Sequence, residues 1–176
     1  MTDNSADRLI LEYNFNSHQK THLTFVGLAI IVVASGVFRD LEDPYFWSKL
    51  LGLSILLISV VILIFSKNGL INNNGKIFLG YFIGKMLLYK KAIDLTDKNA
   101  LAVLKLKKTQ KLAFFTSANP DWSQTFGTFD IALLNSKHTK KDILISLKSQ
   151  DNTDKATDFL TKHTGLEIEV YSPDFS

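Results

Sequence analysis

Two uninterrupted apolar runs dominate the first half of the chain. They extend from Leu23 to Phe38 and from Leu50 to Phe65, and neither holds a charged side chain. Their flanks lengthen both runs toward the roughly 20 residues that a helix needs to cross a bilayer. The pattern predicts a transmembrane helical hairpin at residues 21–66, closed by the short acidic segment from Arg39 to Pro44.

After Ser66 the pattern changes to short apolar stretches separated by turn residues. Strands are predicted at 76–83, 85–95, 101–107, 111–116, 128–134 and 143–147. The pair Asn74-Gly75 predicts a tight hairpin turn, because both residues tolerate positive φ. Short, evenly spaced strands favour an antiparallel sheet, folded as a roll, a small barrel or a sandwich.

The last part of the chain predicts one helix and one closing strand. Asp151-Asn152 can cap a helix whose inward face carries Ala156, Phe159 and Leu160, with His163 at its edge, and Gly165 ends it. Residues 166–170 then alternate between apolar and polar side chains, which predicts an edge strand.

Residues 8–16 alternate in the same way, ahead of the first apolar run. This period of two predicts a strand that returns to pair with an edge of the C-terminal domain. A frayed amphipathic arm is the alternative. The chain thus divides into an N-terminal arm at 1–20, the hairpin at 21–66 and a β domain at 67–176.

Small residues recur at helical spacing within both apolar runs. Gly27 and Ala34 in the first, and Gly52 and Ser59 in the second, are each seven residues apart. Because lipid provides no hydrophobic drive, helices in a bilayer pack closely where such residues meet, and we expect these faces to contact each other. Neither run holds an acidic, basic or histidine side chain, which disfavours a transporter or channel.

Charge predicts the orientation of the hairpin. Residues 1–66 carry a net charge of −2 and residues 67–176 carry +5, and the acidic residues of the first part include three in the hairpin segment. Since positive residues stay in the cytoplasm during insertion, both termini are predicted cytoplasmic, in the cell (inner) membrane. A charge of +5 without a basic cluster disfavours nucleic acid as a partner.

The layout resembles bacterial membrane-anchored proteins with a pleckstrin-homology-like (PH-like) domain. The resemblance lies in residues 74–85 and 92–95 and in the order of elements, and it covers roughly residues 23–165. It implies a pair of transmembrane helices, a bent antiparallel sheet and a C-terminal helix. It also implies a binding or scaffolding module and not a reaction. Separately, the residues give no reason to expect a cofactor.

Two groups of side chains are candidate binding surfaces. A lysine-rich sheet face is the candidate contact for anionic lipid or phosphate, and it consists of Lys85, Lys90, Lys91, Lys105, Lys107 and Lys108. A solvated sheet face is the alternative, because the domain has no Arg for bidentate phosphate binding. Trp122 and Phe126, on a long loop, either anchor a partner protein or fold back onto the core.

The histidines offer little for catalysis or metal binding. His18 and His22 are four residues apart and share a helix face, yet two ligands form an incomplete metal or haem site. His138 and His163 have no catalytic partner in the sequence. Without Cys, a nucleophile elbow or a glycine-rich phosphate loop, an enzyme is disfavoured.

The sequence therefore favours a non-catalytic membrane protein that interacts with a membrane-protein partner or with itself. It is expected to be an accessory subunit of a complex or a homo-oligomeric scaffold. The alternative is a binder of anionic lipid headgroups through the lysine face, and in either case membrane lipids are partners.

Overall fold

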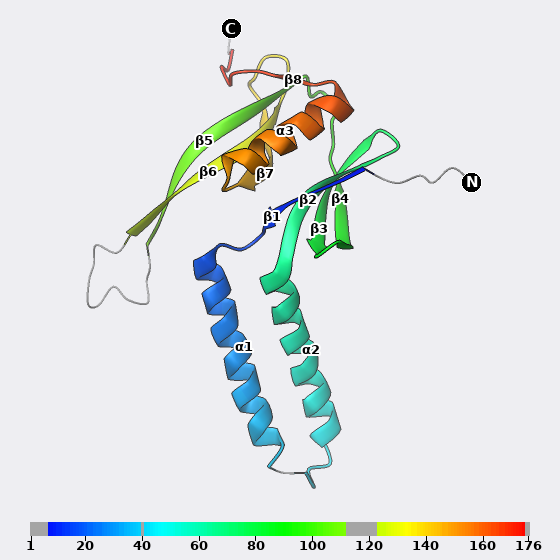
Figure 1. The fold of residues 1–176 in the computed structure, drawn as a ribbon, viewed down its shortest axis with the longest axis vertical. Coiled ribbons are helices and arrows are strands. Elements are labelled where there is room, and N and C mark those ends of the chain that lie inside the picture. Colours follow the sequence, from blue (N-terminus) through cyan, green and yellow to red (C-terminus); the bar gives the residue numbers. More distant parts are fainter. Residues whose placement is uncertain (1–6, 40, 112–122, 175–176) are drawn as a thin grey trace. The chain divides into compact units, whose positions relative to one another are not determined.

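The computed structural model describes residues 7–39, 41–111 and 123–174 (Figure 1). In chain order the elements are β1 (Asp7–Tyr13), α1 (Ser17–Val37), α2 (Phe46–Phe65), β2 (Ser66–Asn73), β3 (Lys76–Ile83), β4 (Met86–Ala92), β5 (Ala100–Lys111), β6 (Ser123–Leu134), β7 (Lys141–Leu147), α3 (Gln150–Thr164) and β8 (Glu167–Ile168). They form two compact units. The hairpin unit contains Tyr13–Asn68 and Tyr81–Tyr89, and the β unit contains Met1–Glu12, Gly69–Gly80 and Lys90–Ser176.

The hairpin unit is built around α1 and α2, which lie side by side (Figure 1). A capping box begins α1: Asn16 Oδ1 accepts from the Gln19 backbone N–H at 2.8 Å, and the Gln19 side chain accepts from Asn16 N–H at 3.0 Å. This cap places the start of α1 four residues earlier than the predicted hairpin boundary. In the most apolar stretch of each helix, only 6% of the residues are buried. Both helices are long and apolar enough to span a membrane.

Two four-stranded sheets make up the β structure. One has the strand order β1-β2-β3-β4, and the other has the order β7-β6-β5-β8. β5 and β6 pair antiparallel from Ala100↔Leu134 to Lys111↔Ser123, whereas the two-residue β8 pairs parallel with β5. The predicted antiparallel strands and C-terminal helix are thus present, and the strand predicted at 8–16 appears as β1, at the edge of its sheet.

Several predicted strand boundaries were wrong for local reasons. β4 ends at Ala92 because Asp94 Oδ1 accepts from Thr96 N–H at 2.9 Å and begins a turn. β5 continues to Lys111, and the rest of the strand predicted at 111–116 lies outside the described residues. The turn at Asn74-Gly75 was predicted correctly, since both residues have positive φ, at 53° and 78°.

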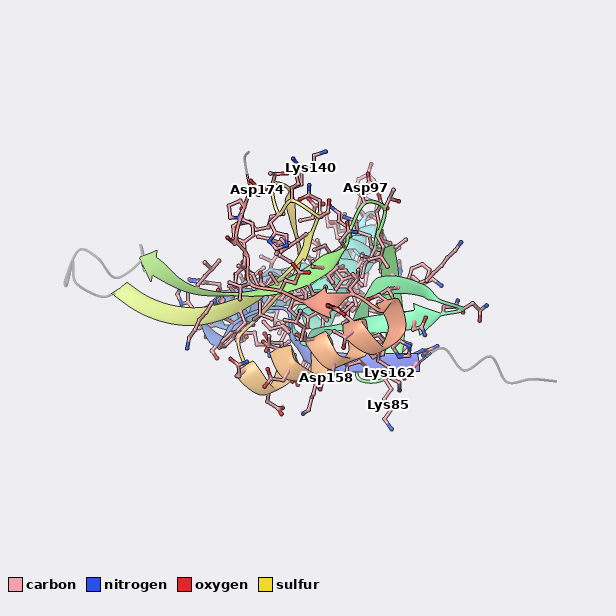
Figure 2. The ribbon with its side chains drawn as sticks, turned by 90° about the horizontal axis from the view of Figure 1, so that it is seen from above. Lys85, Asp97, Lys140, Asp158, Lys162 and Asp174 are labelled. Atoms are coloured by element: carbon pink, nitrogen blue, oxygen red, sulfur yellow. The ribbon has the colours of Figure 1, made fainter. Side chains whose placement is uncertain are left out.

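The core of the β unit lies under α3, which packs against β6 and β7 (Figure 1). Phe159 and Leu160 of α3 join Leu101, Ile131 and Leu147 in one buried cluster. Asp158 and Lys162 lie on the outer side of the helix (Figure 2).

The ends of α3 test two predicted caps. The N-cap is Ser149 and not Asp151-Asn152, because Ser149 already has the extended backbone of a cap, and Asp151 lies in the first turn. The predicted C-cap is confirmed: Gly165 has a left-handed φ of 71°.

Candidate interaction sites

A cleft in the β unit is lined by residues from several strands. Its volume is about 260 Å³, and its lining comprises Leu79, Lys91, Ala92, Ile93, Asp94, Leu133, Asp142, Ile143 and Leu144. β4 and β7, which contribute to it, are edge strands of different sheets. Strand edges carry unpaired backbone N–H and C=O groups, which can bind another extended chain.

A bulge in β7 shapes this cleft. Ile131 pairs with Ile145 and Ala132 pairs with Ile143, so Leu144 is the extra residue. Bulges re-aim side chains at sheet edges. Leu144 packs against the core, while Ile143 leaves 55% of its surface exposed at the cleft.

The acidic groups of the cleft already have structural roles. Asp142 forms an ion pair with Lys98. The hydrogen bond from the Thr96 side chain to the Asp94 carboxylate, with a second from the Thr96 backbone, lowers the pKa of Asp94 below its ordinary value of 3.8. No His, Ser, Thr or Tyr lines the cleft among the described residues. The cleft therefore offers apolar contact and the backbone edges of two strands.

The volume of the cleft limits what it can hold. Sites for drug-sized ligands and cofactors usually measure about 300–1,000 Å³. At about 260 Å³ this cleft is below that range.

The lysine face predicted from the sequence divides between different surfaces. Lys90 and Lys91 are consecutive in β4 and so point to opposite faces. The Lys90 ammonium lies 4.7 Å from the Phe78 ring centroid, whereas Lys91 lines the cleft. Lys85 follows Gly84 in the β3–β4 turn, and its side chain extends outward (Figure 2).

The remaining lysines of that surface are in β5. Lys105 lies 5.7 Å from the ring centroid of Phe129, its cross-strand partner. Lys107 and Lys108 pair by backbone with Gly127 and Phe126, and their side chains are outside the described part of the chain. The sequence placed Lys90 and Lys105 on one sheet face, but β4 and β5 belong to different sheets.

The aromatic residues predicted for partner contact are only partly described. Trp122 lies outside the described residues. Phe126 is in β6, and its backbone pairs with Lys108 of β5, so it belongs to a strand and not to the predicted loop. Its side chain is outside the described part.

His18 and His22 contact each other, as their spacing predicted. Their Nε2 atoms are 3.0 Å apart and the ring centroids are 4.3 Å apart. Among the described residues, no group of three or more His, Cys, Asp or Glu side chains is arranged to hold a metal ion.

The other two histidines have carboxylate partners that the sequence did not reveal. His138 Nε2 lies 2.8 Å from Glu169 Oε2, and its Nδ1 accepts from Ser172 N–H at 3.4 Å. His163 Nε2 lies 3.0 Å from Asp7 Oδ2, and its Nδ1 lies 2.9 Å from Asn72 Nδ2. Both ring nitrogens of each imidazole are engaged within the fold, so neither ring is open to a substrate.

The small residues of α1 and α2 do not all face each other. A Cβ atom on Gly27 would lie 3.6 Å from Val60 Cγ1, so Gly27 is a contact point between the helices. Ala34 lines an apolar groove of about 320 Å³ with residues of α2. Gly52 and Ser59 are exposed, and a Cβ on Gly52 would meet nothing within 4 Å. Gly52 therefore makes no close contact at its Cβ position, because helical spacing does not fix which face meets a neighbour, and the expected contact of Ser59 stays a prediction.

Three residues missed by the sequence interpretation meet at one end of the hairpin. The ammonium of Lys20 lies 3.3 Å from the ring centroid of Tyr13, and that of Lys67 lies 4.8 Å from the same centroid. The available signal was a lysine beside the outer end of each apolar run. We call these three residues the Tyr13 cluster.

Comparison with protein-family models, curated proteins and solved structures finds no match for this chain. Functional inference therefore rests on its own geometry.

Proposed function

We propose that this protein is a two-pass inner-membrane protein whose PH-like β domain is a non-catalytic interaction module on the cytoplasmic side. In this role it is an accessory subunit that docks an extended segment of a partner protein in the cleft. The apolar cleft beside edge strands β4 and β7 is the observation that carries the proposal. An added strand gains affinity from backbone hydrogen bonds and specificity from pockets for alternate side chains.

The two helices support the membrane anchor. Val32 and Leu51 are 69% and 64% exposed, although they are aliphatic. Apolar side chains in such numbers need lipid around them. β2 begins at the residue after α2 ends, so the chain enters the β structure without a linker. The assignment to a PH-like fold rests on this order of elements.

Labelling of single cysteines tests the orientation, since the chain has no native Cys. Leu41→Cys lies in the hairpin loop, and Asn99→Cys lies between β4 and β5. A membrane-impermeant maleimide applied to intact cells should label the first variant alone. Labelling of the second variant alone would reverse the proposed orientation.

A photoreactive amino acid at Ile143 tests the docking proposal. The matched control is the same substitution at Ile168, an isoleucine of β8 that is 58% exposed. One defined partner should crosslink from position 143 and not from 168, and Ile143→Lys should abolish its co-purification with the full chain. Equal crosslinking from both positions, or none, would overturn docking in the cleft. Crosslinking to a second copy of this chain would replace the accessory role with a homo-oligomeric scaffold.

A further inference from the structure

The Tyr13 cluster is held in place by contacts between the chain that enters α1 and the chain that leaves α2. Asn14 N–H donates to the Ser66 carbonyl at 3.1 Å, and Asn14 Nδ2 donates to Ser66 Oγ at 3.0 Å. Ser66 is buried, with 5% of its surface exposed. Asn14 lies three residues before α1 begins at Ser17, and Ser66 directly follows the last residue of α2. Tyr13 and Lys67 each adjoin one of these hydrogen-bonded residues and Lys20 is in the first turn of α1, so the three residues lie at one end of the hairpin.

The two lysines of the cluster differ from several other charged side chains that the structure describes near the helix ends. Within the described ranges, neither Lys20 nor Lys67 forms an ion pair. The first turn of α1 holds no acidic residue, although the N-terminus of a helix carries a positive partial charge. Both ammonium groups lie close to the Tyr13 ring, so they also lie close to each other and repel. Their repulsion falls when an anion binds between them.

The opposite end of the hairpin has a different arrangement. Lys49, in the first turn of α2, forms an ion pair with Asp43 of the loop. Its hydrogen bond to Asp43, with a second from the Tyr45 backbone, lowers the pKa of the Asp43 carboxyl. A carboxylate of the chain thus neutralises the lysine at the loop end. At the Tyr13 end, no carboxylate among the described residues forms an ion pair with Lys20 or Lys67.

We propose that Tyr13, Lys20 and Lys67 form a binding site for the phosphate group of an anionic phospholipid. The two ammonium groups contact its oxygens, and the Tyr13 ring positions them through cation–π contact. Both lysines adjoin the ends of apolar helices, which is the depth of the headgroups in a bilayer. The site depends on the membrane placement of α1 and α2 and is independent of the cleft in the β unit.

Lipid binding to the full-length chain in a non-ionic detergent tests the site. Phosphatidylglycerol and phosphatidylcholine are titrated separately, and bound lipid is counted by native mass spectrometry. The test variant is Lys20→Gln/Lys67→Gln, and the control Lys90→Gln/Lys91→Gln removes the same charge from β4. Since one lysine near an anionic surface contributes roughly fivefold in affinity, the test variant should bind phosphatidylglycerol about 30-fold more weakly. The control should stay within about twofold of the wild type.

Three outcomes would overturn the proposal. The first is unchanged phosphatidylglycerol binding by the test variant, with its circular dichroism melt matching the wild type. The second is an equal loss in the control, which would indicate nonspecific charge attraction. The third is displacement of the lipid by inorganic phosphate at equal concentration, which would make this a free-phosphate site. Ile143→Lys should retain lipid binding, so failure of the cleft proposal remains distinguishable from failure of this one.

Discussion

Two isoleucines with the same exposed fraction show how the hairpin unit differs from the β unit. Ile58 of α2 and Ile168 of β8 are each 58% exposed. Exposed apolar residues recur near Ile58 along the helix, at Ile55, Leu56 and Val61. Ile168, in contrast, lies between Glu167 and Glu169 in a unit with a buried core. Single exposed apolar residues are normal on a protein surface in water, but a whole exposed apolar surface is not. The exposed fraction of an apolar side chain therefore has a meaning only when the surrounding solvent, lipid or water, is known.

Placing a charge at each isoleucine gives the largest expected difference. Ile58→Lys puts an ammonium near the middle of α2, where it should weaken insertion of the span by about 2.5–3.5 kcal/mol. Ile168→Lys should change the free energy of unfolding by less than about 0.5 kcal/mol, because the side chain faces water. The measurement is the fraction of chains that span the membrane, read by impermeant labelling at Leu41→Cys. Equal effects of the two substitutions would mean that α2 faces water.

Packing between α1 and α2 gives the next effect. Gly27→Leu should overpack the contact with Val60 and destabilise the helix pair by about 1–3 kcal/mol. Gly27→Ala should be tolerated, since its Cβ would be at ordinary contact distance, 3.6 Å from Val60 Cγ1.

The matched control for this packing test is Gly52→Leu, because a Cβ there meets nothing within 4 Å. Disulfide formation between Ala34→Cys and Leu53→Cys, which line the same groove, measures helix proximity. Disulfide formation should be slower in the Gly27→Leu variant and unchanged in the Gly52→Leu variant. Slowing in Gly52→Leu to the same extent would show that the packing face is misassigned.

Within the β unit, removing the Glu12 carboxylate should have a smaller effect on stability. This carboxylate connects β1 to residues at the start of α3 by hydrogen bonds. Glu12 Oε1 accepts from Lys148 N–H at 2.8 Å, and Oε2 accepts from Asn152 Nδ2 at 3.2 Å. Glu12→Ala should destabilise the β unit by about 1 kcal/mol, because these donors are exposed enough to gain water in exchange. Hydrogen exchange of the Lys148 amide measures the loss directly. The exposed control Glu167→Ala should leave that amide unchanged, and equal protection in both variants would contradict the contact.

The sequence predicted secondary structure correctly where a single local pattern determines it. The apolar runs predicted both helices, and Asn74-Gly75 and Gly165 predicted a turn and a helix end through their positive φ. Sheet membership was different. The alternation in β4 and β5 gives the face of each side chain but not the partner of each strand. Lys90 and Lys105, expected on one sheet face, therefore belong to two different sheets.

The candidate sites were harder to predict from the sequence, because the sequence does not show which distant segments meet in the fold. Leu79, Lys91 and Ile143 of the cleft are brought together by tertiary structure and share no sequence motif. Lys20 and Lys67 meet at Tyr13 because the hairpin returns the chain to its starting level. A lysine just before the first apolar run of a hairpin and another just after the second therefore predict that both ammonium groups lie at the same surface.

The smallest effect expected concerns an acid at the rim of the cleft. The Thr96 side chain and backbone N–H both donate to the Asp94 carboxylate, so the pKa of Asp94 lies below its ordinary value of 3.8. A carboxyl whose pKa is lower in the folded chain stabilises that state above the unfolded pKa. This stabilisation is lost as the pH falls from about 4 through the folded pKa.

An NMR titration of the Asp94 carboxyl carbon checks this shift. Thr96→Val removes the hydroxyl and keeps the backbone N–H, so the midpoint should rise toward 3.8 without reaching it. Thr161→Val, which removes a hydroxyl that donates to the Asp158 carbonyl in α3, should leave the Asp94 midpoint unchanged. A wild-type midpoint at 3.8 would show that the turn after β4 does not depend on this carboxylate. The end of β4 at Ala92 would then need another cause.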